Sequence, residues 1–561
     1  MSLHIYNTLT RELERFKPLK QDEVKVYYCG PTPYNYAHIG NLRTYLFEDF
    51  VIRTLRFLGY KTRTVMNITD IDDKTIRDSQ TSGKSLKEFT EFYASEFLAD
   101  LTKLHINHAD TISPISDLIP DMGKMIQWLL DKWYAYLAED GSIYYSVSKF
   151  KEYGKLANLD MKGMISSVRI DNDEYEKDQV ADFALWKAYD KETDGENFWE
   201  IKLRVKSEKE KVESNNTTPC VKTSQMRSNS SENREPQWVV SGNTTNEESE
   251  IWTWSTSISE VLLKGRPGWH IECSACNMRF FGAQIDIHMG GIDNLFPHHQ
   301  NEVAQTEAYT GKTFANFWMH GGHLLVDNKK MAKSAGNFYT LRDIVEKNKD
   351  ISEILIYRGF RLMALQNQYR ENFNFTWDRL GASINTIKWL DEMMKRLGRY
   401  MDGLTWDDPE TAGLEDLRER NAKWRLKFHE ISREFRDNQQ SYIQEFIEKL
   451  EDDFDTLGAM TIVFEYQTYI NTAIDDELFS LEECKSIVDF LKTWNEVLAI
   501  FDFDLLRSNE VVPNEIIALL AERNQAKFNK NYKESDRIRD ELDGLGYKII
   551  DEKNGSRVEK K

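Results

Sequence analysis

Four residues that are widely spaced in the sequence have the chemistry of zinc ligands. Cys29 closes an apolar run, Cys273 precedes a predicted helix, and His298 and Glu302 stand four apart in that helix. Residues four apart share one helix face. Two thiolates, an imidazole and a carboxylate form a donor set that suits zinc. Each residue alone could be ordinary packing, so the prediction of a zinc site depends on all four together.

Cys276 offers an alternative to Cys273. The two form a C-x-x-C pair, but a structural zinc site built on such pairs needs a second one, and the sequence contains none. Helical geometry would place both thiols close together. Cys273 is therefore the preferred ligand, and Cys276 stays open as a substitute.

Two further stretches suit nucleotide binding. HIGN (38–41) stands between a predicted strand and a predicted helix, where helix N–H groups attract phosphate. Gly40 would let a flat base or ribose approach the backbone, and His38 can donate to phosphate. Downstream, Lys330 and Lys333 suit a loop that closes over phosphates. The histidine could instead be core packing, and the lysines could belong to a solvated turn.

A parallel sheet would bring these residues together. Residues 24–29 and 61–68 are predicted strands, and the apolar residues between them recur at helical spacing until Gly59. This order predicts a βαβ unit with a right-handed crossover. Ligands of such sheets bind at the carboxyl ends of the strands, where Cys29 and NITDIDD (67–73) lie.

Length and composition limit the class of protein. A chain of 561 residues should form several domains, and its net charge of −20 argues against a broadly basic nucleic-acid coat without excluding a local basic groove. Five cysteines are an odd and sparse set, which indicates a reducing compartment rather than a disulfide framework. We see no signal peptide and no apolar run of roughly 20 residues, so we expect a soluble, intracellular protein.

Other regions differ in their predicted structure. From about residue 187 to 265 the composition changes, and the stretch 207–250 is rich in Ser, Thr, Asn and Glu with little apolar periodicity, which predicts a disordered insert at about 190–255. A helix is expected to begin at Pro297 and to stop at Gly311. Beyond about residue 341 the chain is predicted to be mostly helical, with a short helix–helix–strand tail from about 513.

Several longer stretches resemble one enzyme family. HIGN paired with KMAKS (330–334) is similar to the two signature motifs of class I aminoacyl-tRNA synthetases. The chain resembles cysteinyl-tRNA synthetases, in order and spacing, at YYCGPTPYNYAHIGNLRTYLFEDF, NITDIDDK, DFALWK, GRPGWHIECSAC, FPHHQNEVAQTEA and DDFDTLGAM. The resemblance covers nearly the whole chain and fails over the Ser/Asn-rich segment, which we interpret as an insert.

The resemblance implies an α/β fold class with several domains. It implies a Rossmann-like parallel-sheet catalytic domain with a connective insertion, followed by a helical bundle and a small anticodon-binding domain. The implied boundaries are 1–114 and 265–315 for the two catalytic halves, 115–264 for the connective region with its insert at about 190–255, 316–375 for a stem-contact region with the KMSKS-like loop, 376–505 for the tRNA-binding bundle, and 506–561 for the C-terminal domain.

The resemblance also implies a reaction in two steps. ATP would activate L-cysteine as cysteinyl-adenylate, and the cysteine would then pass to the 3′ end of tRNA(Cys). One Zn²⁺ per chain, held by Cys29, Cys273, His298 and Glu302, would bind the substrate thiol. Cysteine and serine differ only in one atom, which is sulfur in cysteine and oxygen in serine. A pocket that selects by size would discriminate poorly between them, whereas a soft metal ion binds the sulfur preferentially.

Further residue roles follow from the resemblance. The implied catalytic or ATP-binding residues are His38, Gly40, Asn41, Asp293, Lys330 and Lys333. Asp293 would contact the ribose, and Mg²⁺ would accompany ATP. Thr69 and Trp269 would border the cysteine pocket, although an aromatic side chain there could equally be packing.

The chain departs from the family pattern at three places, and other functions stay open. Asn41 replaces a second histidine, Ala332 replaces a serine, and GSRV (555–558) stands where a tryptophan is frequent. The alternatives are a ligase that passes cysteine to an amino sugar, a silent tRNA-binding paralogue, and a zinc-dependent interaction module. We expect a monomer in the cytoplasm, without a membrane partner.

Overall fold

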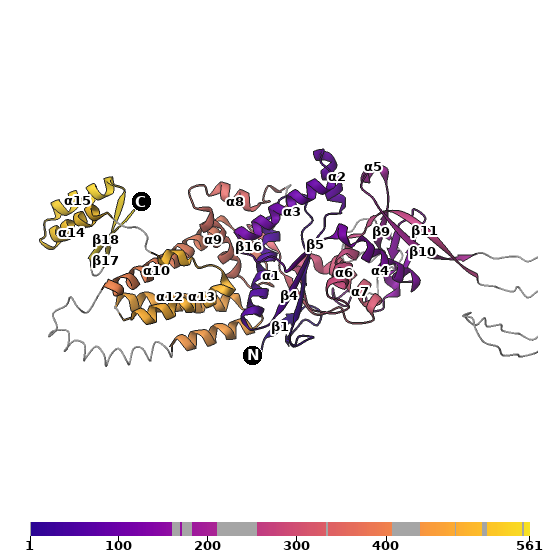
Figure 1. Cartoon of the computed structure of the whole chain (residues 1–561), viewed down its shortest axis with the longest axis horizontal. Coiled ribbons are helices and arrows are strands. Elements are labelled where there is room, and N and C mark those ends of the chain that lie inside the picture. The colour runs from indigo at the N-terminus through magenta and orange to yellow at the C-terminus, as the bar shows by residue number, and fades with distance from the viewer. Residues whose placement is uncertain are drawn as a thin grey trace, which may run out of the picture. The chain divides into compact units, whose positions relative to one another are not determined.

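The computed structural model divides into two compact units. It describes residues 2–159, 169–170, 182–209, 255–332, 335–406, 438–476, 478–507, 513–552 and 555–560. The first unit comprises Met1–Asp343 and Tyr369–Asn374, and the second comprises Ile344–Gln368 and Phe375–Lys561. Figure 1 labels the elements of both.

A five-stranded parallel sheet forms the centre of the first unit. Its strand order is β13-β12-β3-β4-β5, and every neighbouring pair is parallel. The strands are β3 (Val24–Tyr28), β4 (Thr62–Ile68), β5 (Thr111–Pro114), β12 (Ile285–Gly291) and β13 (Ala315–Gly321). Strands β3 and β12 lie side by side although the connective region separates them in sequence. The predicted Rossmann-like parallel sheet is confirmed.

The predicted βαβ unit is formed by β3, the helix α1 (Ile39–Phe57) and β4. The strand VKVYY is apolar and aromatic, and Val26, Tyr27 and Tyr28 are buried. The helix ends at the predicted place, because Gly59 adopts φ +85°, a backbone conformation that glycine reaches without strain. Both strands and the helix therefore follow the sequence pattern.

Further helices complete the first unit and lead into the second. In the first unit they are α2 (Asp73–Ser82), α3 (Leu86–Lys103), α4 (Ile119–Asp131), α5 (Lys191–Asp194), α6 (Trp269–Phe280) and α7 (Gln300–Thr310), and α8 (Leu341–Lys347) crosses into the second unit. Short strands accompany them: β1 (His4–Asn7), β2 (Glu12–Arg15), β14 (Leu324–Val326) and β15 (Lys329–Lys330), with β16 (Phe373–Phe375) at the boundary.

The predicted first helical residue, Pro297, lies in a helical turn that leads directly into α7. Residues Leu295–His299 form a π-type turn, in which Phe296 is extended at φ −140° and ψ 132°, and α7 begins at Gln300. A residue before proline is pushed towards extended geometry, and this applies to Phe296 before Pro297. Gly311 ends the helix with φ +65°, as predicted.

The connective region forms a second sheet, of order β10-β11-β9-β7-β6, with β8 beside β9. Its strands are β6 (Ala135–Leu137), β7 (Ile143–Tyr145), β8 (Arg169–Ile170), β9 (Asp182–Ala188), β10 (Trp199–Lys209) and β11 (Ser255–Pro267). The prediction of disorder is therefore wrong for residues 191–209, which include α5 and β10, whereas β11 begins where the predicted insert ends. Ile201 and Leu203 alternate with polar residues and are buried, which a strand with one buried face allows. The rest of the predicted insert lies outside the described residues.

The second unit is mostly helical, as predicted. Its main helices are α9 (Glu353–Leu365), α10 (Trp377–Trp406), α12 (Thr456–Asp475) and α13 (Leu481–Leu498). The tail contains α14 (Asn514–Phe528), α15 (Tyr532–Gly544) and a hairpin of β17 (Tyr547–Glu552) and β18 (Gly555–Lys560), one strand more than predicted. Among the helices that the structure describes, none combines the length and apolar character needed to cross a bilayer.

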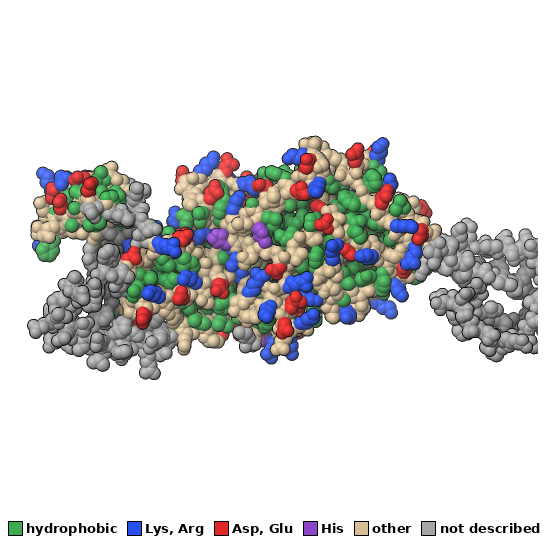
Figure 2. Space-filling view, viewed as in Figure 1, with side chains coloured by type: hydrophobic (Ala, Val, Ile, Leu, Met, Phe, Trp, Pro, Cys, Tyr) green, Lys and Arg blue, Asp and Glu red, His purple; other side chains and the backbone are tan. Residues whose placement is uncertain are grey.

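Figure 2 shows Lys and Arg side chains interspersed with Asp and Glu on the face in view.

Glu48 on α1 is an unusual core residue. Its side chain is 1% exposed, and neither carboxylate oxygen has a hydrogen-bond partner in the described part of the chain. Burial raises the pKa of this carboxyl well above its usual range. Ionising such a group in the core is unfavourable, so the folded state retains a proton that the unfolded chain releases near pH 4.5.

We expect Glu48→Met to raise the melting temperature. The folded pKa lies above the unfolded pKa, so folding stability falls as pH rises above about 4.5, and methionine removes this loss. The gain should be about 1–3 kcal/mol at pH 8 and smaller at pH 5. Thermal unfolding at both pH values measures it, with the exposed Glu91→Met as the matched control. Destabilisation of Glu48→Met at both pH values would contradict the assignment.

Candidate active site

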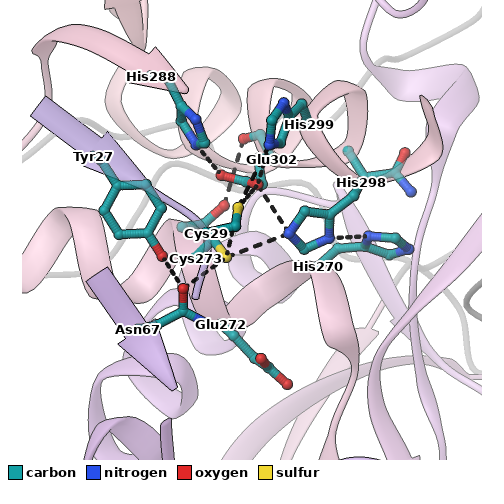
Figure 3. A network of polar contacts seen from close by, with 12 residues as sticks. Tyr27, Cys29, Asn67, His270, Glu272, Cys273, His288, His298, His299 and Glu302 are labelled. Atoms are coloured by element: carbon teal, nitrogen blue, oxygen red, sulfur yellow. Dashed lines mark hydrogen bonds and ion pairs between the residues drawn. The ribbon is translucent and has the colours of Figure 1, made fainter. Parts of the chain in front are cut away.

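The four predicted zinc ligands meet at the carboxyl end of β3 (Figure 3). Cys29 directly follows β3, Cys273 lies on α6, His298 lies in the turn before α7, and Glu302 lies on α7. Cys29 Sγ is 3.7 Å from Cys273 Sγ, Cys273 Sγ is 3.3 Å from His298 Nε2, and that nitrogen is 3.1 Å from Glu302 Oε1. A tetrahedral zinc ion with bonds of about 2.0–2.3 Å holds its ligand atoms roughly 3.3–3.8 Å apart. The donor set therefore fits zinc in type and in spacing.

Burial disfavours the charged form of these donors when no cation is bound. It raises the pKa of the Cys273 thiol to about 11 and that of Glu302 to about 7, and it lowers the pKa of His298 to about 4. The pKa of Cys29 is also raised, first by its hydrogen bond with Cys273 and then by burial. A divalent cation would compensate the missing solvation and would displace the thiol protons.

A second donor set shares two of these residues. Cys29, His288, His299 and Glu302 also place ligand atoms within 4.8 Å of one another. His288 Nε2 is 2.9 Å from Glu302 Oε2, and His299 Nε2 is 3.5 Å from Cys29 Sγ. This set has one thiol where the first has two, so it suits a soft ion less well.

Sequence reasoning assigned no role to either additional histidine. His299 could have been noticed from the His-His doublet, and His288 from its place on β12 beside β3. Cys276, the substitute ligand, is fully buried and belongs to neither donor set within the described residues. The preference for Cys273 agrees with this geometry.

The ring of His298 is held on two sides. Trp269 stacks on it with ring centroids 4.1 Å apart and planes inclined by 22°. His270 Nδ1 lies 3.2 Å from His298 Nδ1, the nitrogen that faces away from the donor cluster. Outer partners of this kind fix the orientation and tautomer of a metal-binding imidazole. Trp269, predicted to border the cysteine pocket, thus lies against a predicted ligand.

Thr69, the other predicted pocket residue, is 2% exposed and follows β4. Its hydroxyl donates to Glu272 Oε2 at 2.8 Å and accepts from Asn67 Nδ2 at 3.1 Å. Asn67 Oδ1 lies 3.9 Å from Cys273 Sγ, so this polar chain extends to the donor cluster. Sequence reasoning missed Asn67 and Glu272, although both stand inside motifs that it quoted.

The HIGN motif begins α1. His38 is the N-cap residue, and its Nδ1 accepts a hydrogen bond from the backbone N–H of Asn41 at 3.2 Å. Asn41 Oδ1 accepts in return from the backbone N–H of His38 at 3.4 Å. This reciprocal pair satisfies two backbone donors at the helix start. Because Nδ1 is an acceptor, the ring proton of a neutral His38 is on Nε2.

The lysine-rich stretch lies against this helix start. A Cβ added at Gly40 would lie 3.2 Å from Met331 Cε and 2.9 Å from the His38 ring, so a larger residue there would require these side chains to shift. Tyr339 O accepts from the backbone N–H of Ile39 at 2.9 Å. The structure therefore brings the two predicted nucleotide motifs together.

Three further residues are predicted to bind ATP, namely Lys330, Asp293 and Lys333. Lys330 is exposed on β15, and its carbonyl accepts from Asn337 Nδ2 at 3.2 Å. Asp293 follows β12, is 69% exposed, and lies 3.2 Å from His323 Nδ1. Lys333 lies outside the described residues.

Comparison with known proteins identifies the family. Residues 15–204 and 202–385 match the catalytic domain of the class I (C) tRNA synthetases, and residues 445–502 match the DALR domain. The chain is 37% identical to the cysteine--tRNA ligase of Chlamydia muridarum over 568 aligned positions that cover all of both chains. It is 36% identical to the cysteine--tRNA ligase of Protochlamydia amoebophila, covering 100% of this chain and 98% of the relative.

Solved structures share the fold. Methionyl-tRNA synthetase of Mycobacterium tuberculosis, in complex with methionyl-adenylate, has a TM-score of 0.53 at 10% identity and covers 88% of this chain and 95% of its own. LeuRS of Agrobacterium radiobacter K84 has a TM-score of 0.52 at 10% identity, with coverage of 89% and 87%. The full-length relatives and the two family models show that the chain belongs to the cysteine--tRNA ligase family, with the catalytic domain of class I tRNA synthetases.

Proposed function

We propose that this protein ligates L-cysteine to tRNA(Cys), first activating cysteine with ATP and then transferring it to the 3′ end of the tRNA. The observation that carries this proposal is the position of a zinc-type donor set at the carboxyl end of β3, one loop before the HIGN motif. Amino-acid recognition and nucleotide recognition would thus occur at neighbouring positions of one sheet.

Cys29, Cys273, His298 and Glu302 would hold the zinc. When bound, the ion supplies a soft Lewis acid that accepts the substrate thiol as a thiolate, which the hydroxyl of serine imitates poorly. The two protein thiols favour this set over the one with a single thiol. Stacked on Trp269, the imidazole of His298 would keep its Nε2 directed at the donor cluster.

The HIGN motif and the lysine-rich stretch would bind ATP. The Nε2–H of His38 is a hydrogen-bond donor for a phosphate oxygen, and Gly40 keeps the helix start open to the adenosine. Asn41 would act through the capping pair, holding the His38 ring in the tautomer that donates. Lys330 and Lys333 would neutralise phosphate charge together with Mg²⁺, and Asp293 would accept from the ribose hydroxyls. Positioning and charge stabilisation suffice for attack on the α-phosphate by the substrate carboxylate.

The second unit would bind the tRNA. It contains the DALR match, and its tail forms two helices and a hairpin. Residues 523–539 are rich in Lys and Arg, which suits contacts with a phosphate backbone. A tRNA acceptor is therefore favoured over an amino-sugar acceptor.

The proposed function predicts cysteine-dependent exchange of pyrophosphate into ATP by the zinc-loaded protein, followed by charging of tRNA(Cys). Serine should support exchange with a kcat/KM at least about a hundredfold lower, because it cannot supply a soft ligand. Absence of exchange in folded, zinc-loaded protein would contradict the proposal. Exchange without tRNA charging would indicate another acceptor.

We expect Cys273→Ser to lose zinc affinity and cysteine activation, because it replaces a thiolate ligand by a hydroxyl. The loss should exceed the roughly 10–100-fold that changes outside the ligand shell cause. Zinc content after competition with a chelator measures it. The matched control is Cys276→Ser, which changes a neighbouring buried thiol on the same helix and should retain zinc. The reverse pattern would reassign the ligand to Cys276.

Zinc affinity should increase with pH between 6 and 8. The raised pKa values of both thiols mean that they are protonated in the metal-free site, so zinc must displace these protons. His298 has a lowered pKa and is already neutral in this range. We expect at least about a tenfold gain in affinity per pH unit, measured with a competing zinc chelator. An affinity that does not change with pH would exclude thiol ligands.

A further inference from the structure

A chain of four buried polar side chains runs beside the donor cluster. The Tyr27 hydroxyl donates to Asn67 Oδ1 at 2.9 Å, and the Asn67 amide donates to Thr69 Oγ1 at 3.1 Å. The Thr69 hydroxyl donates to Glu272 Oε2 at 2.8 Å. All four residues are at most 2% exposed. Figure 3 shows Tyr27, Asn67 and Glu272 around Cys273.

The direction of this chain is set by one backbone group. The N–H of Gly30 donates to Asn67 at 2.9 Å, and because a backbone N–H can only donate, the accepting atom must be the amide oxygen. The NH₂ group of Asn67 therefore faces Thr69. The Thr69 oxygen accepts this bond, and its single hydrogen is directed to Glu272.

Thr69 consequently has no hydrogen left to donate to a substrate. A hydroxyl has one hydrogen and two lone pairs, and here the hydrogen and one lone pair are in use. Towards a bound amino acid, Thr69 can offer only the remaining lone pair. Such a group suits an ammonium, which only donates, and does not suit a carboxylate, which only accepts.

The elements place Thr69 beside the predicted thiol site. Asn67 connects the two, since its Oδ1 also lies 3.9 Å from Cys273 Sγ. Glu272 and Cys273 are consecutive on α6, and Trp269 stands one helical turn before them. A substrate whose sulfur is held at the donor cluster would therefore have its α-substituents near Thr69.

We propose that Glu272 is a positioning residue that makes Thr69 a hydrogen-bond acceptor for the substrate's α-ammonium group, so that the site selects thiols with a free neighbouring amine. This inference rests on the proposed function, because it takes the substrate thiol to bind at the donor cluster. It concerns recognition of the amine and leaves recognition of sulfur to the metal.

The test compares cysteine with 3-mercaptopropionate, which keeps the thiol and the carboxylate and lacks the amine. Calorimetric binding of each to the zinc-loaded, full-length protein gives a ratio of affinities. Glu272→Gln replaces one of the two carboxyl oxygens available to Thr69 by an NH₂ group, which can only donate, and should weaken cysteine binding about 10–100-fold while changing 3-mercaptopropionate binding less than about threefold. Equal losses for both thiols, or no loss, would overturn the proposal.

Thr69 variants provide the matched controls. Thr69→Ser keeps the hydroxyl and should keep the preference for cysteine, whereas Thr69→Val removes it and should lose the preference. If Glu272 acts through Thr69, adding Glu272→Gln to Thr69→Val should change cysteine affinity less than about threefold. Independent, multiplied losses would overturn the proposal. Should Glu272→Gln not retain zinc, a preference for cysteine that survives in Thr69→Val would still overturn the proposal.

Failure of this inference differs from failure of the proposed function. The binding ratio needs no adenylation, so it can be measured whether or not the enzyme is active. The wild-type protein could exchange pyrophosphate with cysteine while Glu272→Gln leaves the ratio of the two affinities unchanged. This result would contradict the role of Glu272 only. Wild-type protein without exchange contradicts the proposed function itself.

Discussion

The site depends on a cluster of polar donors, of which Cys273, His298 and Glu302 are buried and Cys29 is partly buried. Cys29, Cys273, His298 and Glu302 come from a strand end, two helices and a turn, and each is costly to bury as an ion. A single divalent cation would compensate the lost solvation of all four donors. The parallel sheet places Cys29 at the carboxyl end of β3, and α6 and α7 deliver the other donors to the same point. The chemistry of the cluster therefore depends on how these elements pack.

A second constraint acts at the start of α1. The first turn of a helix leaves backbone N–H groups without partners, and here His38 and Asn41 satisfy two of them reciprocally. The same bond that caps the helix also determines which ring nitrogen of His38 carries the proton. The replacement of a second histidine by Asn41 thus has a structural role. Backbone stability and the proposed nucleotide chemistry share these two side chains.

The polar chain from Tyr27 to Glu272 shows how a backbone group can determine chemistry at a distance. The N–H of Gly30 sets the orientation of the Asn67 amide, and that orientation sets the direction of the Thr69 hydroxyl. A Cβ at Gly30 would lie 1.5 Å from the carbonyl oxygen of Asn67, so glycine is required for this close approach. Recognition of the substrate's amine would then depend on how closely two strand ends pack.

The sequence by itself determined the βαβ unit, the helical second unit and the identity of the four clustered donors. The spacing of apolar residues, the end of a strand and the chemistry of a side chain are local properties that can be recognised in the sequence. The sequence predicted the extent of disorder incorrectly, since the pairing of β10 with β11 overrides composition. Only the tertiary structure revealed His288 and His299 beside the cluster and Thr69 between Asn67 and Glu272. These contacts join residues far apart in the chain, and their direction follows from hydrogen-bond partners that no spacing in a sequence specifies.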